Sequence, residues 1–268
     1  MMPRAGLLGV WLALALWPLL KAAAVRLPTL PSITNKKFIN SCVHVHNDLR
    51  SNVQPTASNM RYMTWDAALA RMASARANKC ILEHNVSLSK DDQHHPNFTS
   101  VGENIWFGSH ETFVVADAIK SWYNEVEFYN FTAEECTKVC SHYIQVVWDE
   151  SYKIGCAVTS CKEFARIRNA AVLVCCYSPC GNFSRRPYIE GTPCSNCTEG
   201  DTCEKNLCRN PVRDKAIYYS KWQHSWEFRA VCNEACITLI FLRASLLFLT
   251  FVAGCFIQKH FTDFHMTT

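Results

Sequence analysis

The sequence predicts an α/β protein: a layered domain followed by a small, disulfide-rich segment. Helical periodicity dominates the first part of the chain, and short, β-branched, apolar stretches follow it. Helices and strands mixed within residues 33–187 favour a layered α/β domain. Between Gly191 and Cys208 lie four cysteines among small and polar residues. Such a segment has too few apolar side chains for a core of its own, so it needs cross-links.

The individual elements follow from the spacing of the apolar residues. Phe38, Cys42 and Leu49 recur at helical spacing, and two later stretches repeat this pattern. Helices are therefore predicted at residues 36–50, 65–80 and 111–128. Strands are predicted at residues 142–148, 154–159 and 171–177. The last of these is almost continuously apolar, as expected for a central, buried strand.

The charge balance argues against nucleic-acid binding, and the cysteine content limits the protein to two broad classes. The 27 basic and 23 acidic residues give a net charge of only +4, without the basic excess of a nucleic-acid-binding protein. No nucleic-acid partner is expected. The 16 cysteines leave two interpretations, a disulfide-bonded extracellular protein or a protein with several zinc sites.

Residues 1–24 have the pattern of a secretory signal peptide. Arg4 supplies a short positive region, residues 7–20 are apolar, and three alanines at residues 22–24 offer a cleavage site. The apolar run is too short to cross a bilayer. We therefore expect the rest of the chain to enter the secretory pathway.

Residues 237–257 have the length and composition of a transmembrane helix. Arg243 is their one charged residue, and its long side chain can reach towards the lipid headgroups. Residues 258–268 are mostly polar, whereas a glycolipid-anchor signal would end on its hydrophobic segment. We predict a single-pass type I membrane protein with an extracellular body and a cytoplasmic tail at 258–268. A GPI-anchored or a secreted protein is the alternative.

Sequons for N-glycosylation lie between these two segments. Asparagine followed by any residue and then Ser or Thr occurs five times there. In a secreted chain these positions predict surface glycosylation. The acceptors are Asn85, Asn97, Asn130, Asn182 and Asn196.

Four short stretches carry the residues that could perform chemistry. The first ends the first predicted helix and contains His46 and Arg50. The second is the Gly-Glu-Asn-Ile sequence of residues 102–105, predicted as a turn. The third is Glu125 on the third predicted helix, and the fourth is the predicted strand that His142 opens. Taken singly, each residue is more often structural than functional.

Together these stretches resemble the signature motifs of the CAP superfamily, which comprises cysteine-rich secretory, antigen 5 and pathogenesis-related 1 proteins. The resemblance implies an α-β-α sandwich at residues 33–187 and a cysteine-rich hinge at 191–208. The residues themselves indicate a juxtamembrane stalk at 209–236. It also implies a central cleft with two histidines and two glutamates. The cleft residues would be His46, Glu103, Glu125 and His142. Because two neutral imidazoles suit Zn²⁺, the resemblance raises a zinc site at His46 and His142.

The resemblance implies a partial pattern of disulfides. The implied pairs are Cys80–Cys161, Cys156–Cys175, Cys194–Cys203 and Cys197–Cys208, and proximity adds Cys136–Cys140. An odd number of body cysteines is left, so at least one thiol is free or bridges to another chain. These are Cys42, Cys176, Cys180, Cys232 and Cys236. Cys176 and Cys180 depart from the family pattern, and their pairing with each other or with Cys42 stays open. A zinc ribbon at Cys194 and Cys197 is the alternative for the hinge.

Three functions are compatible with these features. The favoured one is a glycosylated, membrane-anchored CAP protein that binds a lipid, a sterol or a protein partner without catalysis. The chain has no His-Glu-x-x-His helix and no Gly-x-Ser-x-Gly elbow, so an enzyme is not favoured. The second is a zinc-dependent hydrolase in which Glu103 or Glu125 acts as general base. The third is a structural adhesion protein with a vestigial cleft.

Overall fold

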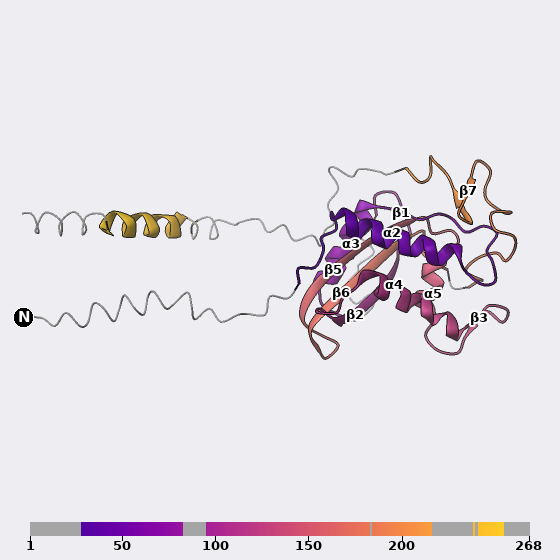
Figure 1. The fold of residues 1–268 in the computed structure, drawn as a ribbon, viewed down its shortest axis with the longest axis horizontal. Coiled ribbons are helices and arrows are strands. Elements are labelled where there is room, and N and C mark those ends of the chain that lie inside the picture. The colour runs from indigo at the N-terminus through magenta and orange to yellow at the C-terminus, as the bar shows by residue number, and fades with distance from the viewer. Residues whose placement is uncertain (1–27, 83–94, 183, 216–237, 239–240, 255–268) are drawn as a thin grey trace, which may run out of the picture. The chain divides into compact units, whose positions relative to one another are not determined.

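The computed structural model describes residues 28–82, 95–182, 184–215, 238 and 241–254 (Figure 1). Several predictions lie outside the described residues. These are the signal peptide, the cytoplasmic tail, most of the stalk, Asn85, Cys232 and Cys236. The chain divides into two units, residues 1–226 and 227–268, and each is described by itself.

A four-stranded sheet forms the centre of the first unit. Its strand order is β1 (Thr64–Trp65), β5 (Lys153–Phe164), β6 (Ile167–Ser178) and β2 (Gly102–Ser109). β1 runs parallel to β5, and the other neighbours are antiparallel. The predicted strands at 154–159 and 171–177 lie within β5 and β6, and β6 is an inner strand as expected.

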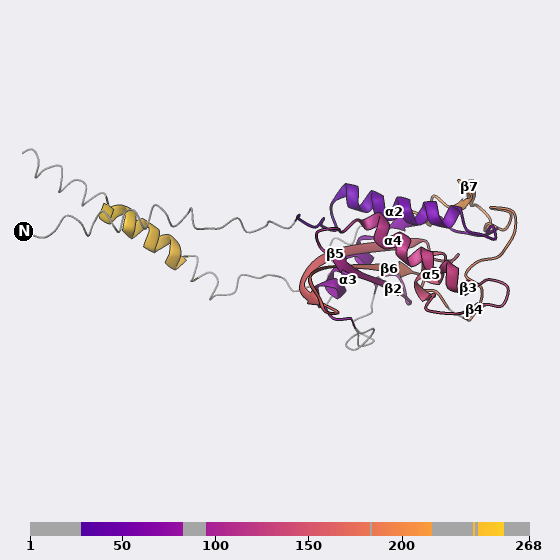
Figure 2. The same ribbon diagram turned by 60° about the horizontal axis from the view of Figure 1, so that its bottom comes forward.

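Helices cover both faces of this sheet. The helices α2 (Lys36–Ser51), α4 (Val115–Tyr123) and α5 (Ser141–Val146) lie on one side, and α3 (Ala67–Asn78) lies on the other (Figure 2). Alternate residues of β6 enter two separate hydrophobic clusters, which explains its continuous apolar run. Leu173, Cys175 and Tyr177 pack with α2 and α4, whereas Val172, Val174 and Cys176 pack with α3. The α-β-α sandwich is therefore confirmed.

Local side-chain chemistry sets the helix ends. The side chain of Asn35 accepts hydrogen bonds from two backbone amides at the start of α2, and Asp66 does the same for α3. The helix predicted at residues 65–80 therefore begins two residues later, as α3. The third predicted helix, 111–128, is α4 followed by a 3₁₀ turn, η2 (Asn124–Phe128). Gly155 lets α3 lie directly on β5, because a Cβ there would overlap the backbone of Leu69 and Ala70.

Two local predictions were wrong. Residues 142–148 are not a strand, because residues 141–146 form α5. The residues from 143 to 148 are all buried. A short segment that is buried on every side has no polar face, so its sequence does not distinguish a strand from a helix. The predicted turn at 102–105 begins β2 instead, since Gly102 to Ser109 pair continuously with β6. Gly102 leaves room for the end of the Gln145 side chain, which a Cβ at residue 102 would displace.

Arg50 joins the end of α2 to the chain around α5. Its side chain is 1 % exposed. Its guanidinium donates to the carbonyls of Arg61, Val146, Trp148 and Ser151 at 2.7–3.2 Å and to that of Asp149 at 3.4 Å. Burial lowers the pKa of Arg50 to about 9, against the attraction of Asp149, so the side chain stays charged at neutral pH. Arg50 thus satisfies several backbone acceptors at once; the carbonyls of Trp148 and Asp149 also accept the amides of Ser151 and Arg61.

The cysteine-rich segment is docked on the sandwich. It contains the small hairpin of β7 (Thr202–Glu204) and β8 (Leu207–Arg209). Cys208 exchanges backbone hydrogen bonds with Met60 (2.7 Å) and Tyr62 (2.9 Å), and the Arg209 guanidinium lies 4.2 Å from the centroid of the Tyr62 ring. A second small hairpin, β3 (Tyr129–Asn130) with β4 (Glu135–Cys136), follows η2.

The second unit contains a helical segment, described at 241–254. Its large apolar side chains are exposed, among them Phe241, Leu247 and Phe248. Within the part of the chain that the structure describes, no helix combines the length and hydropathy needed to cross a bilayer.

Candidate functional site

A cavity of about 290 Å³ lies at the edge of the sheet, between the start of β2 and α5. β2 is an edge strand, so its first residues are open on one side. Most of the lining residues are polar in type, but carbon and sulfur atoms form most of the exposed wall. Its residues are Gly102, Glu103, Asn104, Val139, Ser141, His142, Gln145 and Cys180. Two of the four predicted cleft residues, Glu103 and His142, therefore line one pocket.

Glu125 fixes the position of His142. Its Oε1 lies 2.6 Å from Nδ1 of His142, and its Oε2 accepts the backbone amides of His142 (3.0 Å) and Tyr143 (3.3 Å). These are first-turn amides, which a helix leaves unpaired. Trp122 stacks against the imidazole, with ring centroids 6.4 Å apart and planes at 19°. The carboxylate thus starts α5 and orients the imidazole, leaving Nε2 as the ring nitrogen without a described partner.

His46 lies behind the pocket and not in its wall. Its side chain is fully buried, with Nδ1 2.7 Å from the Cys42 carbonyl and Nε2 2.9 Å from the Tyr177 hydroxyl. A carbonyl only accepts, so Nδ1 carries the proton, and Nε2 accepts from Tyr177. Burial lowers the pKa of His46 to about 4, although the hydrogen bond to the Cys42 carbonyl raises it. The ring is therefore neutral at neutral pH.

Hydrogen bonds connect His46 to the pocket wall. The Tyr177 hydroxyl, which donates to His46, can accept from Nδ2 of Asn104 at 3.4 Å. The same nitrogen donates to the carbonyl of His142 at 3.0 Å. His46 therefore supports the wall through Tyr177 and Asn104, a role that its sequence motif did not reveal.

Glu103 pairs with Arg76 of α3, at 3.3 and 3.4 Å from Nε to the two carboxylate oxygens. Arg76 is almost fully buried, and Glu103 is partly exposed at the pocket. The Glu103 carboxylate thus reaches the pocket, and the guanidinium of Arg76, which belongs to the helix on the other face of the sheet, holds it in place.

The three described cysteines outside disulfides are Cys42, Cys176 and Cys180. They do not pair with one another. Cys42 and Cys176 are buried, whereas Cys180 is half-buried and lines the pocket. Burial raises the pKa of Cys180, so its thiol stays protonated at neutral pH. Its departure from the family pattern was the sequence signal for this pocket residue. Gln145, whose Oε1 accepts the Gly181 amide at 3.0 Å, lies in the same motif as His142 but was not predicted as a site residue.

The proposed pair His46 and His142 does not fit a zinc ion. Zinc needs a ring nitrogen with a free lone pair, and both nitrogens of His46 already have protein partners. Among the residues with described positions, three candidate ligand atoms lie within 4.8 Å of one another only at Cys194, Cys197 and Cys208.

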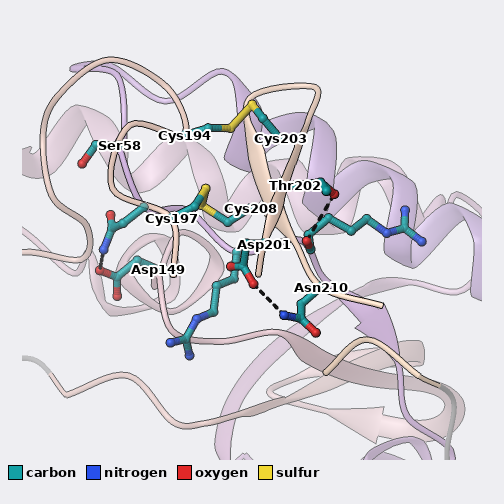
Figure 3. Close-up of a disulfide and its surroundings, with 12 residues drawn as sticks. Ser58, Asp149, Cys194, Cys197, Asp201, Thr202, Cys203, Cys208 and Asn210 are labelled. Carbon is teal, nitrogen blue, oxygen red and sulfur yellow. Dashed lines mark hydrogen bonds between the residues drawn. A yellow bond between two sulfur atoms is a disulfide. The ribbon is translucent and has the colours of Figure 1, made fainter. Parts of the chain in front are cut away.

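Those three cysteines are in disulfides, so the zinc-ribbon alternative is wrong. Cys194 is bonded to Cys203 and Cys197 to Cys208, which removes the thiolates that zinc requires (Figure 3). Figure 3 also shows Asp201 directed at Asn210, which donates to it at 2.9 Å. The structure contains the remaining pairs as well: Cys80–Cys161, Cys136–Cys140 and Cys156–Cys175.

Four of the five predicted glycosylation acceptors have described positions. Asn97, Asn130, Asn182 and Asn196 are all exposed. Each is therefore accessible to a glycosyltransferase, and glycosylation at these sites stays a prediction.

Comparison with known proteins identifies the family. Residues 43–177 match the model of the CAP family, described as the cysteine-rich secretory protein family. The chain belongs to the CAP family. It is 46 % identical over 217 residues to GLIPR1-like protein 1 of Bos taurus, covering 80 % of this chain and 89 % of that protein.

Two further matches extend this comparison. Glioma pathogenesis-related protein 1 of Mus musculus is 45 % identical over 218 residues, with 81 % of each chain covered. Among solved structures, "NaASP2 with Zn2+" superposes with a TM-score of 0.50 at 26 % identity, covering 68 % of this chain and 99 % of that one. This CAP protein thus belongs to a family of extracellular proteins and has a disulfide-rich C-terminal region.

Proposed function

We propose that this CAP protein is a non-catalytic, extracellular binding module whose pocket at β2 and α5 receives part of a protein partner. The observation that carries the proposal is the state of the pocket's reactive groups. Burial raises the pKa of the Cys180 thiol, so it is not a thiolate nucleophile at neutral pH. His46 cannot act as a base on a ligand, because both its nitrogens are engaged behind the wall.

The pocket suits part of a protein better than a lipid or a sterol. Its exposed wall is mainly apolar, but its volume of about 290 Å³ is at the lower limit for a drug-sized ligand and leaves little room for a sterol or an acyl chain. Val139 at its rim is 64 % exposed. An exposed apolar side chain beside convergent polar groups is typical of a small protein-recognition site.

Residues 237–257 are proposed to anchor the protein in the membrane, with residues 1–24 as signal peptide. The apolar sequence and the exposed apolar side chains at 241–254 support this. Retention in the membrane pellet after alkaline carbonate extraction is expected. Release into the supernatant would instead favour the secreted form, and release by a phospholipase would favour the GPI anchor.

A zinc-dependent hydrolase is the second candidate, and the solved structure of NaASP2 with Zn2+ supports it. In this chain the pocket offers one imidazole, His142, and one carboxylate, Glu103. These are fewer than the three protein ligands of a usual catalytic zinc site. No turnover of a peptide library is expected with added Zn²⁺. Turnover that is lost in His142→Ala would support the hydrolase.

Site-specific photo-crosslinking tests the binding module directly. A diazirine-bearing leucine analogue replaces Val139 in the full chain on cells, and a matched variant carries it at Val212, which is 85 % exposed. We expect a discrete protein adduct from position 139 and none from position 212. A lipid-sized adduct at 139 would assign the pocket to a lipid. The same adducts at both positions, or none at either, would contradict the proposal.

A further inference from the structure

The tip of the β5–β6 hairpin displays a cluster of basic side chains. Lys162, Arg166 and Arg168 are exposed, and Glu163 is the one acidic residue between 162 and 169. Within the described part of the chain, none of the three basic residues forms an ion pair of 4.0 Å or less. Glu163 lies directly opposite Arg168 in the β5–β6 register and offsets part of its charge, and the net positive charge of the tip is open to an anionic ligand.

Two residues at this tip, Ala165 and Arg166, have left-handed backbone conformations, which place Arg166 in the turn of the hairpin. The two-residue turn consists of Ala165 with φ 46° and Arg166 with φ 69°. Such turns normally carry Asn or Gly, because most side chains are unfavourable in the left-handed region of the backbone. Non-glycine residues in this region are a reason to look for a function. Here the strained turn carries a charge at the outermost point of the hairpin.

Several contacts hold the base of the hairpin, so the backbone that carries the three basic residues has a fixed position. Phe164 packs on Phe107 with ring centroids 5.1 Å apart. Cys161 is bonded to Cys80 at the end of α3, and the carbonyl of Asn169 accepts the amide of His110 at 3.0 Å. A fixed backbone adds no cost of loop ordering to binding, so only the side chains have to be ordered.

Three of the four described glycosylation acceptors have contacts away from this tip. Asn182 follows the opposite end of β6, and Phe98, next to Asn97, packs on Tyr152 just before β5. Asn196 donates its backbone amide to Ser58 beside the cysteine-rich segment. A large ligand can therefore approach the hairpin tip without meeting glycans at these sites.

We propose that the hairpin tip binds a sulfated polysaccharide. Sulfate groups along such a chain match separated guanidinium and ammonium groups on a fixed scaffold. An acidic bilayer is a weaker match, because the tip has no exposed large apolar side chain that could enter it: Phe164 is 3 % exposed and Ile167 is half-buried. This inference is independent of the pocket at β2 and α5.

Heparin binding by the full chain in mild detergent tests the proposal. The variant Lys162→Ala, Arg166→Ala, Arg168→Ala is expected to bind at least about tenfold more weakly at physiological ionic strength. Its log affinity should also fall less steeply with log salt, by about 2 in slope. Glu163→Gln should bind more tightly, because it removes the opposing charge. Unchanged affinity in the triple variant would overturn the proposal.

Two controls separate the tip from net charge and from backbone strain. The variant Lys120→Ala, Lys138→Ala, Lys205→Ala removes three exposed charges elsewhere and is expected to lose less than about threefold. An equal loss in this control would show that binding is not localised. Ala165→Gly relaxes the turn and should keep full affinity. Binding to phosphatidylserine vesicles that depends on the same three residues, without heparin binding, would assign the tip to a membrane instead.

Discussion

The sandwich of residues 36–178 and the cysteine-rich segment of residues 191–215 pack against each other but are held together differently. The sandwich has two hydrophobic clusters on either side of its sheet and a buried arginine that ties α2 to the chain around α5. In the cysteine-rich segment only Leu207 and Cys208 are buried apolar residues. Two disulfides and the Asp201–Arg213 ion pair take the place of a core.

The difference teaches that the two regions should respond to acid in separate ranges. The sandwich depends on a neutral imidazole, His46, whereas the cysteine-rich segment depends on an ionised carboxylate, Asp201. A neutral buried histidine is sensitive to weakly acidic conditions, and a paired aspartate only to stronger acid. Four predictions test this comparison, from the largest expected effect to the smallest.

Arg50→Met should have the largest effect. It leaves the carbonyls of Val146 and Ser151 without the Arg50 donor and leaves Trp148 with the Ser151 amide alone, so we expect a loss of about 3–5 kcal/mol in the free energy of unfolding. Denaturant unfolding followed by tryptophan fluorescence measures it. The exposed Lys37→Ala serves as control and should change stability by less than about 0.5 kcal/mol. A loss below about 1 kcal/mol for Arg50→Met would show that water satisfies these carbonyls.

His46 should make the sandwich acid-sensitive between about pH 6.5 and 4. Its pKa is about 4 in the folded state, so the unfolded chain binds a proton first as pH falls. Stability is complete above the unfolded value of about 6.5 and falls by roughly 3 kcal/mol towards pH 4. Unfolding of the wild type and of His46→Gln at several pH values measures this. A slope in this range that persists in His46→Gln would assign the sensitivity to another group.

Removing the Cys197–Cys208 bond with a double Cys→Ala variant should loosen the cysteine-rich segment alone. The bond closes a loop with a sequence separation of 11, which in the chain-entropy treatment is about 3 kcal/mol. We expect faster proteolysis within residues 191–215 and an almost unchanged melting temperature of the sandwich. Matched removal of Cys156–Cys175, inside the sheet, should lower that temperature instead. Equal effects of both variants would show that the two regions unfold together.

Asp201 should give the smallest effect and the lowest pH range. Although burial alone would raise its pKa, hydrogen bonds from Arg213 and Asn210 lower it below its ordinary value. Its contribution is therefore complete above the unfolded pKa of about 3.9 and is lost as pH falls through the folded pKa. Hydrogen exchange of residues 201–213 should accelerate only below about pH 4. Acceleration already at pH 5–6 would place this region with the sandwich.

The spacing of apolar residues correctly predicted the helices and strands that pack on the core with one or both faces. It failed where side-chain hydrogen bonds determine the secondary structure. Residues 36–50 and 171–177 were correct because their apolar spacing reports packing directly. Residues 143–146 are all buried, and the start of the helix depends on Glu125, which lies 17 residues before His142. A contact of that kind leaves no periodic pattern in the sequence.

The site was predicted in part for a similar reason. Glu103 and His142 line one pocket, and Glu125 contacts His142, as the motifs suggested. His46 lies in a correct motif but behind the wall, because its neighbours Cys42 and Tyr177 supply partners for both ring nitrogens. Tyr177 is 131 residues away in sequence, so only the folded chain could show that the ring was already satisfied.

Gly155 limits how this domain can vary. A Cβ at that position would overlap the backbone of Leu69 and Ala70, which no side-chain rearrangement can relieve. An inherited or engineered change of Gly155 to any other residue would force a whole helix away from the sheet. Screens of sequence variants should therefore find this codon intolerant even though it encodes no functional group.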